Sequence, residues 1–189
     1  MKIILASESQ RRKDLLNKIN LKFKVIPSLF DESTIEITHN KPTEYCSYLA
    51  FQKALDVSKN FPNTIVIGAD TIVYHNDKII GKPKDEKEAK RQLKILSGET
   101  HTVYTAVHVI SEKLKIKEKI IDSTRVTFNE LNEVDIEFYI KNFRPYDKAG
   151  SYGIQDWSSI FVEKIDGCFY NVVGFPLPKF YKLIHSILK

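Results

Sequence analysis

The chain has 189 residues, of which 42% are hydrophobic and 28% charged, and its net charge is +5. This length and composition predict a globular protein with one sizeable core, and no apolar run is long enough to span a membrane. The lysines are scattered beside acidic residues, which is typical of solvated helix faces and argues against a nucleic-acid-binding module.

The two cysteines, Cys46 and Cys168, have no metal-type spacing. Their separation favours free buried thiols in a reducing cytosol, with a disulfide as the alternative. Because the first residues lead directly into an apolar strand, we expect no secretory signal and a cytoplasmic location.

Strands and helices are predicted to alternate along the first half of the chain. Apolar runs predict strands at residues 3–5, 23–26 and 64–67, the last resuming at 72–74 after Asp70. Amphipathic spacing predicts helices that begin at the Arg11-Arg12 pair, at Pro42 and after Asp85. Residues 28–41 are polar and irregular.

The second half begins with two alternating β segments between residues 101 and 128, which predict an antiparallel pair. Asn132 is placed to cap a helix, residues 160–165 favour a strand, and Pro176 and Pro178 introduce a last helix. The order of elements predicts an α/β fold with a mixed sheet, flanking helices and a cleft.

Arg11 and Arg12 follow the first strand across a small polar turn. Ser7 and Ser9 are candidate N-caps, since a hydroxyl can accept from a free N–H of the first helical turn. Such a helix start suits an anion, and arginine binds phosphate through two parallel hydrogen bonds. The pattern indicates a phosphate site. The simpler alternative is that one arginine pairs with a surface carboxylate and the other is solvated.

Asp70 is the strongest single candidate for chemistry. It follows a buried strand beside Gly68 and Ala69, and open α/β sheets bind ligands at the carboxyl ends of strands. A carboxylate there can hold Mg²⁺ or accept a proton from water, although turn aspartates are also common. Glu32 offers a second oxygen ligand of the kind that Mg²⁺ or Mn²⁺ prefers, but by itself it has the character of a surface residue.

Three more polar side chains could meet a nucleotide. Lys82 lies between Gly81 and Pro83, which fix the backbone around its ammonium group, although the segment lacks the Walker A pattern. Gln155 ends a loop with two glycines, and its amide could bind the edge of a base. Lys53, taken alone, has the character of a solvated lysine. The five histidines show no ligand spacing.

Taken together, these segments resemble the Maf family of nucleoside triphosphate pyrophosphatases. The matching pieces are Leu5-Ala6-Ser7 with Ser9 and Arg11-Arg12, Glu32, Lys53-Ala54, Gly68-Ala69-Asp70-Thr71, Gly81-Lys82-Pro83, Leu96-Ser97-Gly98 with His101, Asp147-Lys148-Ala149-Gly150, Gly153-Ile154-Gln155 and Val173-Gly174-Phe175-Pro176. Each piece is weak alone, but the ordered set spans nearly the whole chain. Gln10 replaces a usual proline and Phe175 a usual leucine, and neither touches a proposed catalytic group.

The resemblance implies one domain over residues 1–189, with an elongated α/β fold similar to the inosine triphosphate pyrophosphatases and two lobes around a central cleft. It implies hydrolysis of a nucleoside triphosphate to the monophosphate and pyrophosphate, with Mg²⁺ or Mn²⁺ as cofactor. By similarity Asp70 is the proton acceptor. Arg11, Thr71 and Gln155 match the branch acting on dTTP and UTP, whereas the branch acting on 7-methyl-GTP looks different at these positions.

We therefore expect Glu32 and Asp70 to hold the metal against the triphosphate. Arg12, Lys53 and Lys82 would neutralise charge on the departing pyrophosphate. Thr71 and Gln155 would read the pyrimidine edge.

Two other functions stay open: a non-catalytic nucleotide-binding regulator of cell division, and a pyrophosphatase of the 7-methyl-GTP type. The acids favour an enzyme, because without a metal they would repel a polyphosphate. The expected partner is a small nucleotide, with no stable nucleic acid and no membrane. The sequence leaves open the metal, modified pyrimidine nucleotides as substrates, and a homodimer.

Overall fold

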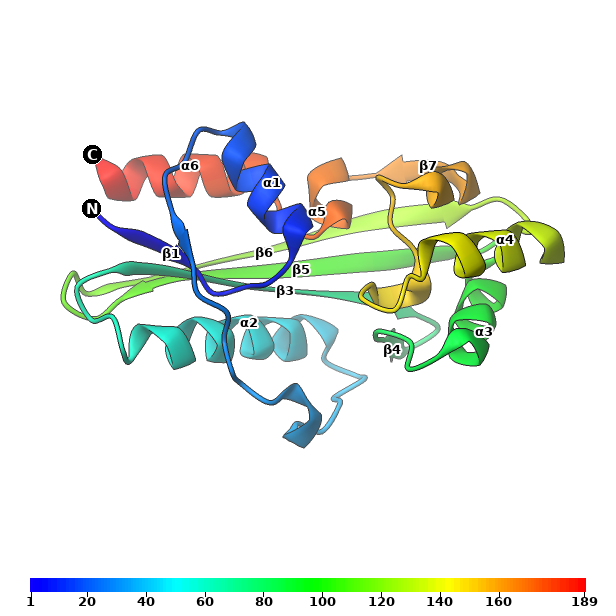
Figure 1. The fold of residues 1–189 in the computed structure, drawn as a ribbon, viewed down its shortest axis with the longest axis horizontal. Helices are drawn as coiled ribbons and strands as arrows, with labels where there is room; N and C mark the ends of the chain where they lie inside the picture. Colours follow the sequence, from blue (N-terminus) through cyan, green and yellow to red (C-terminus); the bar gives the residue numbers. More distant parts are fainter.

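The computed structural model describes residues 1–189 as a seven-stranded mixed sheet with helices on both faces (Figure 1). The strand order is β2-β1-β3-β5-β6-β7, and β4 pairs with β3. The strands are β1 (Ile3–Leu5), β2 (Lys24–Val25), β3 (Ile65–His75), β4 (Lys78–Ile80), β5 (Thr100–Ser111), β6 (Ile116–Phe128) and β7 (Val162–Asp166). The expected mixed α/β architecture is confirmed.

The helices are α1 (Gln10–Lys18), α2 (Pro42–Ser58), α3 (Glu86–Leu96), α4 (Glu133–Phe143), α5 (Phe169–Val173) and α6 (Leu177–Leu188). Short 3₁₀ turns occupy Glu32–Thr34, Ala149–Ser151 and Trp157–Phe161. None of the helices combines the length and the apolar character needed to cross a bilayer. Both cysteines are free thiols, Cys46 buried and Cys168 partly exposed.

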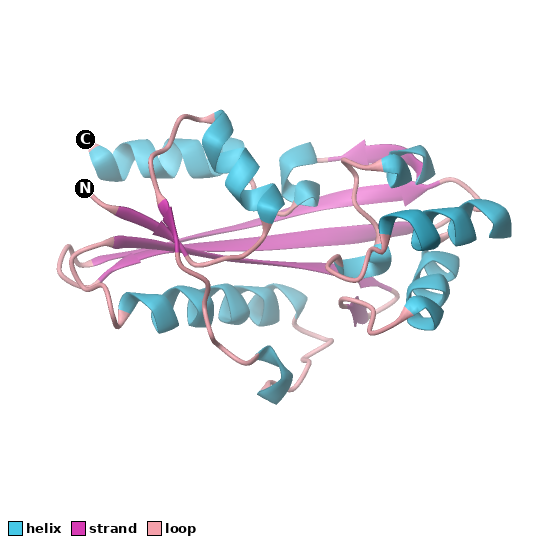
Figure 2. Ribbon diagram, in the orientation of Figure 1, coloured by secondary structure: helices cyan, strands magenta, loops and turns pink.

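The sheet separates two hydrophobic layers because side chains alternate between its faces. Along β3, Ile65, Ile67 and Val73 join the main core together with residues of α1, α3, α4 and α6. Val66 and Ile72 point to the other face, where they join smaller clusters with residues of α2. Figure 2 shows α2 along one face of the sheet and α1, α5 and α6 along the other.

Several predicted helix and strand boundaries are confirmed. Asp85 caps α3, its Oδ1 accepting from Glu88 N at 2.7 Å, and Asn132 caps α4, its Oδ1 accepting from Asp135 N at 2.8 Å. β5 and β6 form the expected antiparallel pair. The sequence predicted both helix starts correctly, because a short polar side chain can accept a hydrogen bond from a backbone N–H of the first turn.

Two predictions are wrong, and one helix was missed. The runs at residues 64–67 and 72–74 are one continuous strand, β3, because pairing with β5 carries the backbone through Gly68–Thr71. The strand predicted at 160–165 begins at Val162, since the 3₁₀ turn capped by Asp156 precedes it. Helix α5 has only five residues and was not predicted.

One edge of β3 is interrupted. β5 pairs with β3 continuously from Val66 to Tyr74. On the opposite edge, β1 pairs with residues 65–67 and β4 with residues 73–75. Residues 68–72 therefore have no strand beside them on that edge, because β1 has ended and the chain turns toward α1. This gap leaves room for a ligand beside the middle of a rigid strand.

Helix α2 lies directly against this part of β3. A Cβ atom added to Gly68 would lie 2.4 Å from Ala50 O and 2.6 Å from Ala54 N, both on α2. Glycine is therefore required for two backbones to approach so closely. Because Lys53 precedes Ala54, the contact at Gly68 also fixes the distance of Lys53 from the strand.

Replacing Gly68 with alanine should push α2 away from β3. We expect the free energy of unfolding to fall by about 1–3 kcal/mol, as for other overpacked cores. Urea denaturation measures the loss. Gly81→Ala is the control, because a Cβ there would meet nothing within 4 Å. Equal stability of the two variants would contradict the proposed role of this contact.

Candidate functional site

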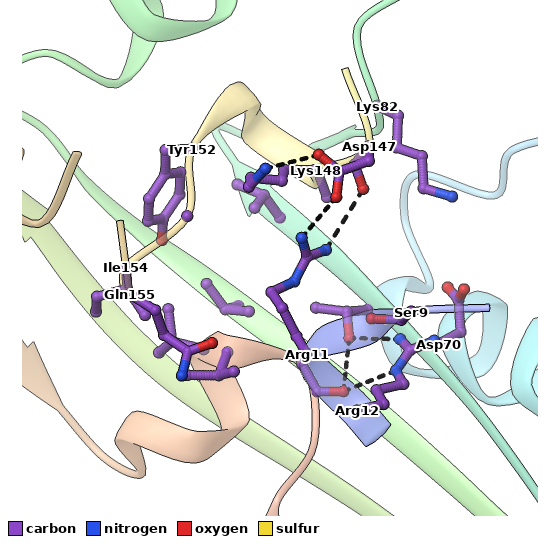
Figure 3. A pocket seen from close by; sticks show the side chains of 18 of the residues that line it. Ser9, Arg11, Arg12, Asp70, Lys82, Asp147, Lys148, Tyr152, Ile154 and Gln155 are labelled. Atoms are coloured by element: carbon purple, nitrogen blue, oxygen red, sulfur yellow. Dashed lines mark hydrogen bonds and ion pairs between the residues drawn. The ribbon is translucent and has the colours of Figure 1, made fainter. Parts of the chain in front are cut away.

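A cleft opens along the unpaired edge of β3 and consists of two adjoining pockets. One pocket includes Asp70, Thr71 and Gln155, and the other includes Glu32. The residues lining both are Ser9, Arg11, Arg12, Lys53, Lys82 and Asp147. The first pocket is seen in Figure 3. All eight predicted site residues therefore line one cleft.

Lys53 joins the two acidic residues. Its Nζ lies 2.5 Å from Asp70 Oδ1 and 2.8 Å from Glu32 Oε1. The side chains of Lys53 and Asp70 are only 12% and 10% exposed. The expectation that Lys53 by itself would be a solvated lysine is wrong, because α2 presents it to β3 rather than to water.

This bridge favours the charged forms of Lys53 and Glu32. Burial opposes the charge on Lys53, but attraction by Asp70 and Glu32 outweighs it and raises the pKa of the ammonium group. Burial alone would also raise the pKa of Glu32. The nearby Lys53 and Lys82 ammonium groups reverse this effect and hold the Glu32 pKa below its ordinary value.

Glu32 and Asp70 also fit a divalent metal by the chemistry of their oxygens. Both carboxylates already converge on a single cationic nitrogen, so one ion can be shared between them. No group of three or more His, Cys, Asp or Glu side chains is placed to hold a metal ion by itself. Two carboxylates are nevertheless a usual protein contribution for Mg²⁺, which takes its remaining ligands from water and substrate phosphates.

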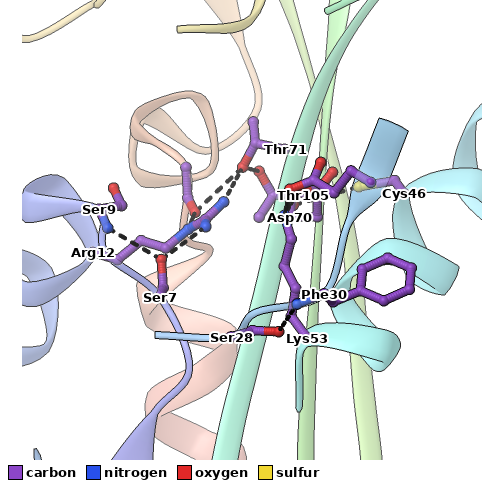
Figure 4. A network of polar contacts seen from close by, with 12 residues as sticks. Ser7, Ser9, Arg12, Ser28, Phe30, Cys46, Lys53, Asp70, Thr71 and Thr105 are labelled. Atoms are coloured by element: carbon purple, nitrogen blue, oxygen red, sulfur yellow. Dashed lines mark hydrogen bonds and ion pairs between the residues drawn. The ribbon is translucent and has the colours of Figure 1, made fainter. Parts of the chain in front are cut away.

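Arg12 is held by neutral acceptors only (Figure 4). Its Nε donates to Gly174 O at 3.0 Å, Nη1 to Ser7 Oγ at 3.2 Å and Nη2 to Thr71 Oγ1 at 3.1 Å. Burial lowers the pKa of this guanidinium despite the raising effect of nearby Asp70. Because no carboxylate forms an ion pair with it, Arg12 is a fixed cation available to an anion in the cleft.

Arg11 is engaged differently. Its Nη1 forms an ion pair with Asp147 Oδ2 at 2.6 Å across the mouth of the cleft (Figure 3). Burial raises the pKa of Asp147, but hydrogen bonds from Lys148 and Arg11 lower it below the ordinary value. The alternative that one arginine of the pair binds a surface carboxylate is therefore confirmed for Arg11. Arg12 is not solvated, as that alternative supposed, but is held by hydrogen bonds within the protein. Asp147 had appeared only within the family motif.

Two expectations about local structure near the site are wrong. Asp70 lies in the middle of β3, opposite Ala106, rather than past the end of a strand. Ser9 precedes α1, but no side chain caps that helix. The Ser7 hydroxyl instead accepts from Ser9 N at 3.3 Å and from Arg12 Nη1. The turn thus orients an arginine instead of capping the helix.

Asp70 and Thr71 point to opposite faces of the sheet, as neighbours on a strand must. Asp70 meets Lys53 on the α2 face, whereas Thr71 meets Arg12 and Thr105 on the other. Because the edge of β3 is open here, the cleft reaches both side chains. Thr105 had not been singled out, since threonine in an alternating strand is ordinary.

Replacing Lys53 with methionine should leave the Asp70 carboxylate buried without its cation. We expect a loss of about 3 kcal/mol in the free energy of unfolding at pH 7. Because the Glu32 pKa is lowered in the folded protein, its stabilisation exists above about pH 4.3 and disappears on acidification. The deficit of the variant should therefore shrink between pH 7 and pH 3.

Urea denaturation at both pH values tests this. Lys90→Met is the matched control, since Lys90 also bridges two carboxylates, Glu133 and Glu137, but on the surface. Its loss should be much smaller, because solvent screens exposed pairs. A pH-independent deficit in Lys53→Met would contradict the electrostatic account.

Comparison with known proteins agrees with the resemblance seen in the sequence. A family model described as Maf-like protein matches residues 2–187. A dTTP/UTP pyrophosphatase of Clostridium botulinum strain Eklund 17B is 45% identical over 189 residues, covering 100% of both chains. A dTTP/UTP pyrophosphatase of Bacillus cereus strain G9842 is 48% identical over 181 residues, covering 94% of this chain and 91% of its own.

Among solved structures, a HAM1 protein from Coxiella burnetii shares the fold. It matches with a TM-score of 0.53 at 14% identity, over 98% of this chain and 99% of its own. The family match covers nearly every residue, and the relatives match from end to end. The chain therefore belongs to the Maf family.

Proposed function

We propose that this chain is a metal-dependent pyrophosphatase that hydrolyses dTTP and UTP, and modified pyrimidine nucleotides, to the monophosphate and pyrophosphate. The names of the full-length relatives at 45% and 48% identity support the reaction class. The observation that carries the proposal is the bridge of Glu32, Lys53 and Asp70 beside Arg12 and Lys82 in one cleft. The two lobes that the family resemblance implies for this chain would form the two walls of this cleft.

The acidic side of the cleft would carry the chemistry. A divalent ion bound there would neutralise phosphate oxygens and make a nearby water more acidic. Glu32 and Asp70 are the residues that would hold it. Asp70, supported by a strand paired continuously with β5, would orient the attacking water and accept its proton. The pyrophosphate is the leaving group.

The cationic side would bind the triphosphate. The three nitrogens of Arg12 are held by hydrogen bonds before any ligand arrives, so the side chain would lose little conformational freedom on binding. Lys82 faces both pockets, and Lys53 already lies within contact of the acids. These three groups would stabilise the charge that builds up on the departing pyrophosphate.

Recognition of the base would fall to the opposite face of the sheet. Thr71 and Gln155 line the pocket that excludes Glu32, and Arg11 borders it through its pair with Asp147. The Gln155 amide offers both a donor and an acceptor, and the Thr71 hydroxyl adds a further polar contact, which suits the edge of a pyrimidine.

A pyrophosphate-release assay tests the activity. UTP, dTTP, CTP, GTP, 5-methyl-UTP and 7-methyl-GTP are compared with Mg²⁺, with Mn²⁺ and with EDTA. We expect the uracil and thymine nucleotides to be hydrolysed fastest and EDTA to abolish release. Preference for 7-methyl-GTP would contradict the substrate assignment. Binding without release from any substrate would favour the non-catalytic regulator.

Asp70→Asn tests the proton acceptor. Because the amide cannot take a proton, kcat should fall by about two orders of magnitude or more. Isothermal titration with UMP should still show binding, since the cationic side is untouched. Asp77→Asn is the matched control, because Asp77 lies in the exposed β3–β4 turn, outside the cleft. Near-normal turnover by Asp70→Asn would rule out this role.

A further inference from the structure

Behind Thr71 lies a hydroxyl that no ligand can reach. Thr105 stands opposite Thr71 in the β3–β5 ladder and is 0% exposed. Its Oγ1 lies 3.0 Å from Thr71 Oγ1 (Figure 4). It also lies 3.0 Å from the backbone carbonyl oxygen of Asn171. Thr105 therefore links a residue of the cleft to α5, which packs on the same face of the sheet.

These contacts favour one direction for each hydrogen bond. A carbonyl oxygen cannot donate, so the hydrogen bond at Asn171 O uses the Thr105 proton. The contact between the two threonines then needs the Thr71 proton. The remaining carbonyl near Thr71, Gly174 O at 3.4 Å, is a weaker competitor because it already accepts from Arg12 Nε at 3.0 Å.

The chain of donors thus runs one way, from Arg12 through Thr71 and Thr105 to Asn171. Arg12 Nη2 donates to Thr71, and this polarises the Thr71 hydroxyl toward Thr105. A hydroxyl has one proton and two acceptor positions. With its proton used by Thr105 and one acceptor position used by Arg12, Thr71 can offer a ligand only its second acceptor position.

Asn171, the last acceptor in this series of hydrogen bonds, is itself held in place. Asn171 is 0% exposed, and its Nδ2 donates to Val103 O and to Thr124 Oγ1, both at 3.0 Å. Its carbonyl oxygen accepts from Gly174 N at 3.0 Å as well as from Thr105. Removing the Thr105 hydroxyl would therefore leave this carbonyl with a partner and the anchor in place.

We infer that Thr105 is a positioning residue that makes Thr71 a hydrogen-bond acceptor toward the base, and so favours pyrimidines that carry a ring N–H. Uracil and thymine have such a donor at N3, whereas cytosine has an acceptor there. The inference rests on the proposed function, in which Thr71 reads the base. It adds a residue that selects the substrate without touching it.

Thr105→Val tests the inference, since valine keeps the shape and removes the proton acceptor for Thr71. The freed Thr71 hydroxyl can then rotate and donate to cytosine N3. We expect the ratio of kcat/KM for UTP to that for CTP to fall by about three- to tenfold, the worth of one hydrogen bond. A ratio between substrates is unaffected by the fraction of enzyme that is folded.

Thr105→Ser should restore the ratio to within about twofold of the wild-type value, because the hydroxyl returns. Thr100→Val is the matched control: it breaks a similar bond, Thr100 to Thr127 at 2.9 Å, on the same strand pair but outside the cleft. Its ratio should not change. If Thr105→Val does not fold, Thr105→Cys keeps the volume with a weaker hydrogen-bonding group and should lower the ratio in the same direction.

If the ratio of kcat/KM for UTP to that for CTP is unchanged in Thr105→Val, the inference is overturned. This includes the case in which both values fall by the same factor. The proposed activity would stay intact. A wild-type enzyme that releases no pyrophosphate from UTP would instead refute the proposed function itself. The two failures are therefore distinguishable in one set of assays.

Discussion

The site depends on the direct contact between helix α2 and strand β3 at Gly68. Without a side chain there, the helix backbone approaches close enough for Lys53 to reach Asp70. A lysine on a more distant helix would extend into water and leave the carboxylate buried alone. The same contact brings Glu32 into the arrangement, since Lys53 bridges both acids. One close approach of two backbones thus sets the geometry of three charged groups.

The second constraint is the gap beside residues 68–72 of β3. A strand flanked on both edges could not offer Asp70 and Thr71 to a single ligand, because their side chains lie on opposite faces. Here β1 and β4 leave the edge free between them. The backbone stays rigid through its pairing with β5, while the ligand has access to both faces. Adjacent residues can therefore serve chemistry and recognition separately.

The charges of the cleft suit the polyanion and the metal of the proposed reaction. The acids are held together by a lysine, which keeps two carboxylates close without repulsion. Arg12 is oriented by neutral oxygens, so its charge is directed to the ligand and not cancelled by an internal partner. Arg11 is paired with Asp147 at the rim, where the pair can exchange for contacts to the substrate.

The sequence alone determined the fold class, most of the elements and a set of candidate site residues. Periodicity located α1 to α4, the β5–β6 pair and α6, because burial of one face imposes a local repeat. The ordered motifs identified the family and eight of the residues that line the cleft.

Only the tertiary structure decided that Asp70 lies within a strand, that Lys53 is buried between two acids, and that Thr105 stands behind Thr71. These facts depend on contacts between residues far apart in the chain. A single lysine or threonine has the same local pattern whether it faces water or a carboxylate, so no local signal could reveal them.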